Sequence, residues 1–166
     1  MARRVLITLL PGTRGRITAP ELRRIARRVL DAENVAPHVE VEIVLAGEES
    51  SRELNRLYRG RDEPADVLSF ASHEGEAFLD APDAAPSIGE IVICVPLVER
   101  QLEASPQSGE ANRTVSGEIA HLLTHGLLHV LGYDHELGEA ESLAMKRRED
   151  DLLTDLGYAG AYAHGH

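Results

Sequence analysis

The chain has 166 residues, which is long enough for one domain with a sizeable hydrophobic core. Apolar residues make up 43% of it, which excludes a chain that stays disordered because it has too little to bury. Its single cysteine, Cys94, cannot form an internal disulfide, and no apolar run reaches the roughly 18 residues that a membrane-spanning helix needs. We therefore expect a cytoplasmic protein that does not bind membranes.

Charge is unevenly distributed along the chain. The formal net charge is −11, which argues against nucleic-acid binding through overall charge alone. Residues 1–30 nevertheless contain eight arginines and one acid, a balance of +7, so the rest of the chain carries −18. Four of these arginines form either a nucleic-acid contact or the solvated face of a helix: Arg23, Arg24, Arg27 and Arg28.

Hydrophobic periodicity predicts the secondary structure in chain order. Thr18 is an expected helix N-cap, because Leu22, Ile25 and Val29 follow it at helical spacing. The predicted strands are 3–10, 38–47, 65–71 and 87–96. The predicted helices are 18–35, 48–60, 96–105, 110–131 and 136–156.

This order of elements predicts an α/β (α+β) fold, with one small mixed sheet of about four strands packed with about five helices. Residues 72–87 are rich in Ala, Pro and Asp, and we predict a surface loop or lid there rather than a domain boundary. We expect a single domain over 1–160. Residues 161–166 have no apolar period, and we expect them to form a disordered tail.

The stretch "HGLLHVLGYDH" places three histidines within eleven residues, at 125–135. His125 and His129 are four residues apart on a predicted helix, so they project from one side of it, one turn apart. Gly132 is expected to end that helix and turn the chain back, which brings His135 within reach as a third nitrogen ligand. Three protein ligands leave an open coordination position, which is typical of a catalytic zinc site rather than a structural one.

The same stretch matches the metzincin protease pattern H-E-x-x-H-x-x-G-x-x-H at its histidines and its glycine. It departs from that pattern at Gly126, where the proteases carry the glutamate that acts as general base. We therefore expect a metzincin-like metal-binding helix without peptidase chemistry. We also expect Gly126 to leave room for a bulky phosphodiester beside the metal, where a carboxylate would repel it.

These residues resemble the YbeY family of bacterial endoribonucleases, whose hallmark is H-G-x-L-H-L-x-G-Y-D-H. The stretch at 125–135 departs from it only at Val130. Two further blocks are similar to the family: "LNRLYRGRDEPADVLSF" at 54–70, with Ala65 where threonine is usual, and "IGEIVIC" at 88–94, with Glu90 where aspartate is usual. The helix that carries Glu141, Met145 and Glu149 also fits the family.

The resemblance implies a metal-dependent endoribonuclease that cuts single-stranded RNA. It further implies 3′-end maturation of 16S rRNA, ribosome quality control, and contacts with the small ribosomal subunit and its assembly factors; no DNA substrate is expected. The ligands that it implies are His125, His129 and His135, and its functional arginine falls on Arg59. A guanidinium suits that role because it is a permanently charged, bidentate partner for phosphate.

The sequence leaves two possible roles open for each of four further residues. Asp134 either orients a ligand imidazole or caps the turn, and His121 either supports the site or is a core histidine. Asp66 and Ser69 either line the cleft or cap and pair the strand on which they lie.

We expect one zinc ion per chain, although nickel or another divalent metal also suits imidazole ligands. Two alternative functions remain open from the sequence. One is a metallopeptidase, and the other is a non-catalytic ribosome-assembly factor with a structural metal, which a fourth protein ligand would favour.

Overall fold

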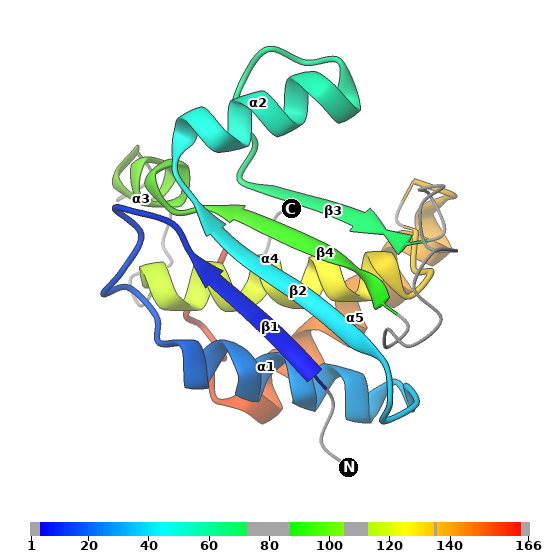
Figure 1. Cartoon of the computed structure of the whole chain (residues 1–166). Coiled ribbons are helices and arrows are strands. Elements are labelled where there is room, and N and C mark those ends of the chain that lie inside the picture. Colours follow the sequence, from blue (N-terminus) through cyan, green and yellow to red (C-terminus); the bar gives the residue numbers. More distant parts are fainter. Residues whose placement is uncertain (1–3, 73–86, 105–112, 135, 164–166) are drawn as a thin grey trace.

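A computed structural model describes residues 4–72, 87–104, 113–134 and 136–163. Helices cover both faces of a four-stranded sheet (Figure 1). The strands are β1 (Arg4–Leu9), β2 (Glu40–Ala46), β3 (Val67–Ala71) and β4 (Ser87–Cys94). The helices are α1 (Ala19–Ala32), α2 (Glu48–Arg59), α3 (Val95–Ala104), α4 (Val115–Val130) and α5 (Glu139–Leu156).

Each of these elements lies within a few residues of its predicted position, so the predicted α/β fold class is confirmed. Thr18 caps α1 as expected, because its side chain accepts a hydrogen bond from the Glu21 amide. Residues 73–86 of the predicted surface loop lie outside the described part of the chain.

The sheet has the strand order β1-β2-β4-β3, so β3 is an edge strand. β1, β2 and β4 are parallel to one another, whereas β3 pairs with β4 in the antiparallel direction. The Cys94 amide donates to the Asp66 carbonyl at 2.9 Å, so these two residues are a hydrogen-bonded pair. In an antiparallel ladder such pairs recur at every second residue, here at Leu68 and Phe70 of β3. The amide and carbonyl of Ser69 consequently point outward, away from β4 and toward the open edge.

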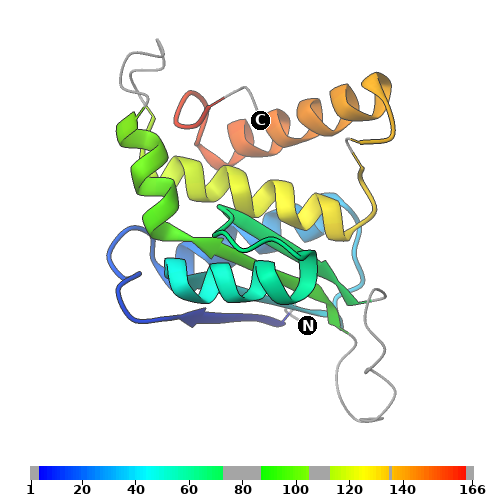
Figure 2. The ribbon, with the colours of Figure 1, turned by 90° about the horizontal axis from the view of Figure 1, so that it is seen from above.

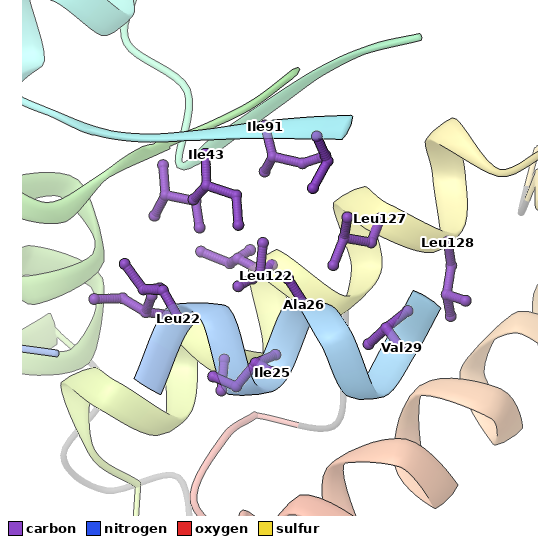
Figure 3. Close-up of a cluster of buried hydrophobic side chains, with 14 of the residues drawn as sticks. Leu22, Ile25, Ala26, Val29, Ile43, Ile91, Leu122, Leu127 and Leu128 are labelled. Atoms are coloured by element: carbon purple, nitrogen blue, oxygen red, sulfur yellow. The ribbon is translucent and has the colours of Figure 1, made fainter. Parts of the chain in front are cut away.

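The main hydrophobic core lies between the sheet and the pair α1 and α4. Figure 3 shows Ile43 of β2 and Ile91 of β4 above the apolar faces of these two helices, with Leu22 and Ala26 on α1 and Leu127 on α4. α5 packs on the outer side of this pair, and α2 lies on the opposite face of the sheet (Figure 2). There a smaller apolar cluster forms around three buried residues, Ala46, Leu68 and Val92.

Two of the four arginines of α1 hold that helix against α5. Arg24 pairs with Glu21 and donates to the Leu156 carbonyl at 2.8 Å, and Arg28 pairs with Asp155. For Arg24 and Arg28 these contacts favour a place on the face of the helix over a role in nucleic-acid binding. None of the helices within the described ranges is long and apolar enough to cross a membrane.

The expectation of a disordered tail from residue 161 is wrong for residues 161–163. Tyr162 is 2% exposed, and its hydroxyl donates to Asp150 at 2.7 Å. The Thr114 amide donates to the Ala161 carbonyl, and the Ala163 amide donates to Glu118. Hydrophobic periodicity does not predict this packing, because a single aromatic ring anchors the segment and a single residue gives no repeating pattern. Residues 164–166 lie outside the described ranges.

We predict that Tyr162→Ala lowers the free energy of unfolding by about 3 kcal/mol, because it leaves a cavity where the buried ring packs against His121. Urea denaturation measures this change. Leu143→Ala, on the exposed side of α5, is the control and is expected to change stability by less than about 0.5 kcal/mol. Equal stability of wild type and Tyr162→Ala would show that the segment does not pack in solution.

Candidate functional site

The histidine stretch forms the second half of α4 and the turn that follows it. Thr114 caps the helix, and His125 and His129 lie one turn apart near its end. Gly132 adopts a φ of 111°, which a residue with a Cβ rarely adopts, and the Tyr133 amide donates to the Leu128 carbonyl at 3.0 Å. The prediction that this glycine ends the helix is therefore confirmed.

Each of these two histidines has a hydrogen-bond acceptor behind its ring. Nδ1 of His125 lies 2.8 Å from Oε2 of Glu149, and Nδ1 of His129 lies 3.1 Å from the carbonyl oxygen of Tyr133. A carboxylate and a carbonyl can only accept, so both Nδ1 atoms carry the proton and donate it. The basic lone pair is then on Nε2 in both rings, which is the state that metal-ligating histidines adopt.

Glu149 on α5 connects two histidines of α4. Its Oε1 accepts a hydrogen bond from Nε2 of His121 at 2.8 Å, while its Oε2 accepts the one from His125. Glu149 is 6% exposed. Burial disfavours its charge, but the hydrogen bonds from His121 and His125 outweigh burial and lower the pKa of Glu149 to about 2. The carboxylate is therefore ionised at neutral pH and holds the His125 ring in place.

His121 lies deeper in the molecule than the other two histidines. Its side chain is buried, bonded to Glu149, and packed against the Tyr162 ring with 4.8 Å between the ring centroids. His121 is therefore a buried core histidine that also supports the site, because it bonds Glu149, the residue that orients His125.

The donor set of α4 fits a transition-metal ion, because two imidazoles one turn apart both use Nδ1 for a protein hydrogen bond and leave Nε2 for a metal. His135, the third predicted ligand, lies outside the described residues. Within the described ranges, no group of three His, Cys, Asp or Glu side chains could hold a metal ion. The three-histidine centre therefore stays a prediction.

The structure gives Gly126 a different role from the one expected. A Cβ at this position would lie 3.1 Å from Cγ2 of Ile91 and 3.6 Å from Cγ2 of Val67, so the residue faces the sheet and not a substrate. The expectation that Gly126 leaves room for a phosphodiester is wrong. The glycine instead allows α4 to pack closely against β3 and β4, and no side-chain base could occupy this position.

The position of α4 directs its histidines toward the open edge of the sheet. His129 and His125 lie about 60° and 100° around the helix from Gly126, both on the same side. Leu127 lies on the other side and packs toward α1 (Figure 3). Because α1 contacts β1 and α4 contacts β3, the histidine side of α4 faces the outer edge of β3.

Arg59, the last residue of α2, reaches the same edge from the other face of the sheet. Its Nη2 donates to the Ser69 carbonyl at 2.8 Å, and its guanidinium carbon lies 5.2 Å from the centre of the Phe70 ring. Gly60 ends α2, and the chain then returns to β3 held by Ser51 and Asn55, whose side chains bond the backbone at Ala65 and Glu63.

The remaining candidate residues have identifiable hydrogen bonds. Asp134 accepts from the Glu136 amide at 2.8 Å, which caps the turn after Gly132. Asp66 accepts from the Val67 amide at 2.8 Å, at the start of β3. Ser69 contributes its carbonyl to Arg59, and by strand alternation its side chain lies on the α4 face with Val67.

Glu149 is a site residue for which the sequence predicted no role, although its helix is similar to the family. One signal was available: Glu149 lies on the buried side of α5, between Met145 and Leu152, where a carboxylate is rarely found without a partner. Its partners could not be named, because they lie 24 and 28 residues earlier in the chain.

The fold and the site together define a class: a small α/β protein whose polar site lies at the open edge of its sheet, with helix histidines on one side and an arginine on the other. The family model described as Endoribonuclease YbeY matches residues 13–157. The chain therefore belongs to the YbeY endoribonuclease family.

Named relatives agree with this result. Endoribonuclease YbeY of Dehalococcoides mccartyi is 39% identical over 148 residues, covering 84% of this chain and 82% of that protein. The YbeY protein of Pelotomaculum thermopropionicum is 38% identical over 153 residues, covering 89% and 95%. The solution structure of TM1509 from Thermotoga maritima, 24% identical, has a similar fold, with a TM-score of 0.55 and 93% of each chain covered.

We predict that Gly126→Glu lowers the free energy of unfolding by about 3 kcal/mol or more, because it forces a carboxylate against Ile91 and Val67. Gly126→Ala is the control, since its added methyl needs a shift of only a few tenths of an ångström and alanine favours the helix. Urea denaturation of both variants measures the difference. Wild-type stability of Gly126→Glu would contradict the packing role.

We predict that Glu149→Gln weakens zinc binding by about 10- to 100-fold, the usual effect of losing a partner behind a ligand histidine. The amide keeps the shape of the carboxylate but can accept from only one of the two rings. Competition with a chromophoric chelator measures the affinity. Asp151→Asn, an exposed change on the same helix, should bind zinc as the wild type does; equal affinity of Glu149→Gln would remove Glu149 from the site.

Proposed function

We propose that this endoribonuclease cuts single-stranded RNA with one metal ion, preferably zinc, held by His125, His129 and His135. The proposed role is 3′-end maturation of 16S rRNA and ribosome quality control, in the cytoplasm, together with the small ribosomal subunit and its assembly factors. The observation that carries the metal proposal is the pair of acceptors behind His125 and His129, which set both rings in the ligating state.

The residues of the chain divide the work between them. A bound metal ion would supply Lewis-acid chemistry at the phosphoryl group. Glu149 and the Tyr133 carbonyl hold the two rings in orientation, so the ligands need little rearrangement. Arg59, fixed on the Ser69 carbonyl at the outer edge of β3, binds a phosphate oxygen and stabilises the negative charge that develops on it.

The peptidase alternative is disfavoured by Gly126, because its position against Ile91 has no room for the glutamate that such an enzyme needs. The direct test incubates purified protein with single-stranded RNA and with casein, at known metal content. Cleavage of RNA and not of casein is expected. Cleavage of casein that persists through purification, with intact RNA, would favour the peptidase.

We predict that His129→Ala loses the bound metal ion and RNA cleavage together. A pair of ligands binds far more weakly than three, because the chelate is broken. Elemental analysis of both purified proteins measures metal content. His38→Ala, a change far from the motif in the sequence, is the control, and equal metal content in wild type and His129→Ala would remove the proposed site.

We predict that Arg59→Ala slows RNA cleavage by about 100-fold, the usual effect of losing one charge-stabilising donor. Melting temperature and metal content should stay near wild type, because Arg59 is exposed. Arg59→Lys should recover only part of the rate, since it lacks the planar fork. Single-turnover cleavage of a labelled RNA measures the rates, and a wild-type rate for Arg59→Ala would disprove the proposed role.

A further inference from the structure

A pocket of about 470 Å³ lies on the α2 face of the sheet, on the opposite side from α4. Phe70 and Glu90, which are register partners in β3 and β4, both line it. Val67 and Ile91, which lie an odd number of residues away from them on the same strands, face Gly126 on the other side. Figure 2 shows α2 and α4 on opposite sides of the sheet, so this pocket is separate from the histidine site.

The pocket has an aromatic wall. The Tyr58 and Phe70 rings lie 5.2 Å apart between centroids, at 57° to each other, and both line the pocket. Tyr58 is 64% exposed, so most of its ring is available to a ligand. The volume is within the usual range for small-ligand sites. An exposed aromatic wall of this kind suits a flat ring, and unpaired bases stack on such side chains with a gain of roughly 1–3 kcal/mol each.

The pocket also holds two carboxylates. Glu42 of β2 and Glu90 of β4 are register partners on adjacent strands, and both line the pocket. Burial, and then the charge of Glu42, raise the pKa of Glu90, so the pair is costly without a hydrogen-bond donor opposite it. Among the described residues that line the pocket, Arg59 is the only cation. The ligand that fits has donors on one side and an anionic group on the other.

We propose that this pocket binds one unpaired guanine of the RNA substrate, stacked on the exposed Tyr58 ring with its donor edge toward Glu42 and Glu90. Guanine presents adjacent ring N–H and amino donors, which match carboxylate oxygens. Uracil has only one donor on the same edge, its ring N–H, and that donor lies between two carbonyl oxygens that the carboxylates repel. The proposal rests on the proposed function, because it takes RNA to be the substrate.

Arg59 connects this pocket to the proposed cleavage site. It lines the pocket, and its guanidinium lies at the Ser69 carbonyl on the outer edge of β3, toward which the histidines face from the other side. A single strand whose base enters the pocket can place its phosphate on Arg59 and continue over this edge. Only unpaired nucleotides can be splayed out in this way, which agrees with a single-stranded substrate.

The test compares mononucleotides, which contain no internucleotide bond and therefore report binding without cleavage. Guanosine 5′-monophosphate, uridine 5′-monophosphate and ribose 5-phosphate are titrated into the metal-loaded protein and followed by NMR. We expect the guanine nucleotide to bind about tenfold more tightly than the uracil nucleotide, in line with one good base contact. We also expect the ring resonances of Tyr58 to shift. Equal affinity of all three ligands would overturn the proposal.

Variants separate the two parts of the pocket. The double change Glu42→Gln and Glu90→Gln should reduce the guanine preference to less than about threefold, whereas Glu103→Gln, an exposed charge removal on α3, should keep it. Tyr58→Ala should weaken both nucleotides about tenfold, whereas Leu57→Ala, equally exposed on the same helix and not part of the lining, should not.

The outcomes also distinguish this proposal from the proposed function. A protein that cuts RNA but shows no base preference, or whose preference survives the double change, overturns the guanine pocket alone. A protein that neither cuts RNA nor binds any nucleotide overturns both.

Discussion

The candidate site depends on one buried carboxylate. Glu149 accepts hydrogen bonds from His121 and His125, and because it lies on α5 while both histidines lie on α4, it also joins the two helices. An ionised carboxylate among apolar residues is stable only when its oxygens are satisfied, and the two ring donors do this. The same interaction therefore fixes the packing of α5 and the orientation of a proposed metal ligand.

A second constraint sets the position of α4 itself. Gly126 lets the helix approach β3 and β4 so closely that even a methyl group would press on Ile91. This contact fixes the rotation of α4 about its own axis, with Gly126 toward the sheet. The helical period then directs His125 and His129 toward the outer edge of β3. The glycine and the histidines belong to one motif because one sets the packing and the others depend on it.

The edge strand β3 organises the rest of the site. It separates the histidine side from the pocket around Phe70, and its outward Ser69 carbonyl holds Arg59 where the two sides meet. An unpaired strand edge is commonly a liability for aggregation. In this protein β3 is short, and its outer edge is bound by Arg59 of α2, whose positive charge suits an anionic chain.

The sequence by itself determined the local features: the order of strands and helices, the N-cap at Thr18, the one-turn spacing of His125 and His129, and the turn at Gly132. These follow from periodicity and backbone preference, which act over a few residues. Only the tertiary structure decided that Glu149 stands behind His125, that Gly126 faces the sheet, and that Tyr162 is buried. Each of these is a contact between segments far apart in the chain, and its partner depends on how the helices pack on the sheet, which no local pattern records.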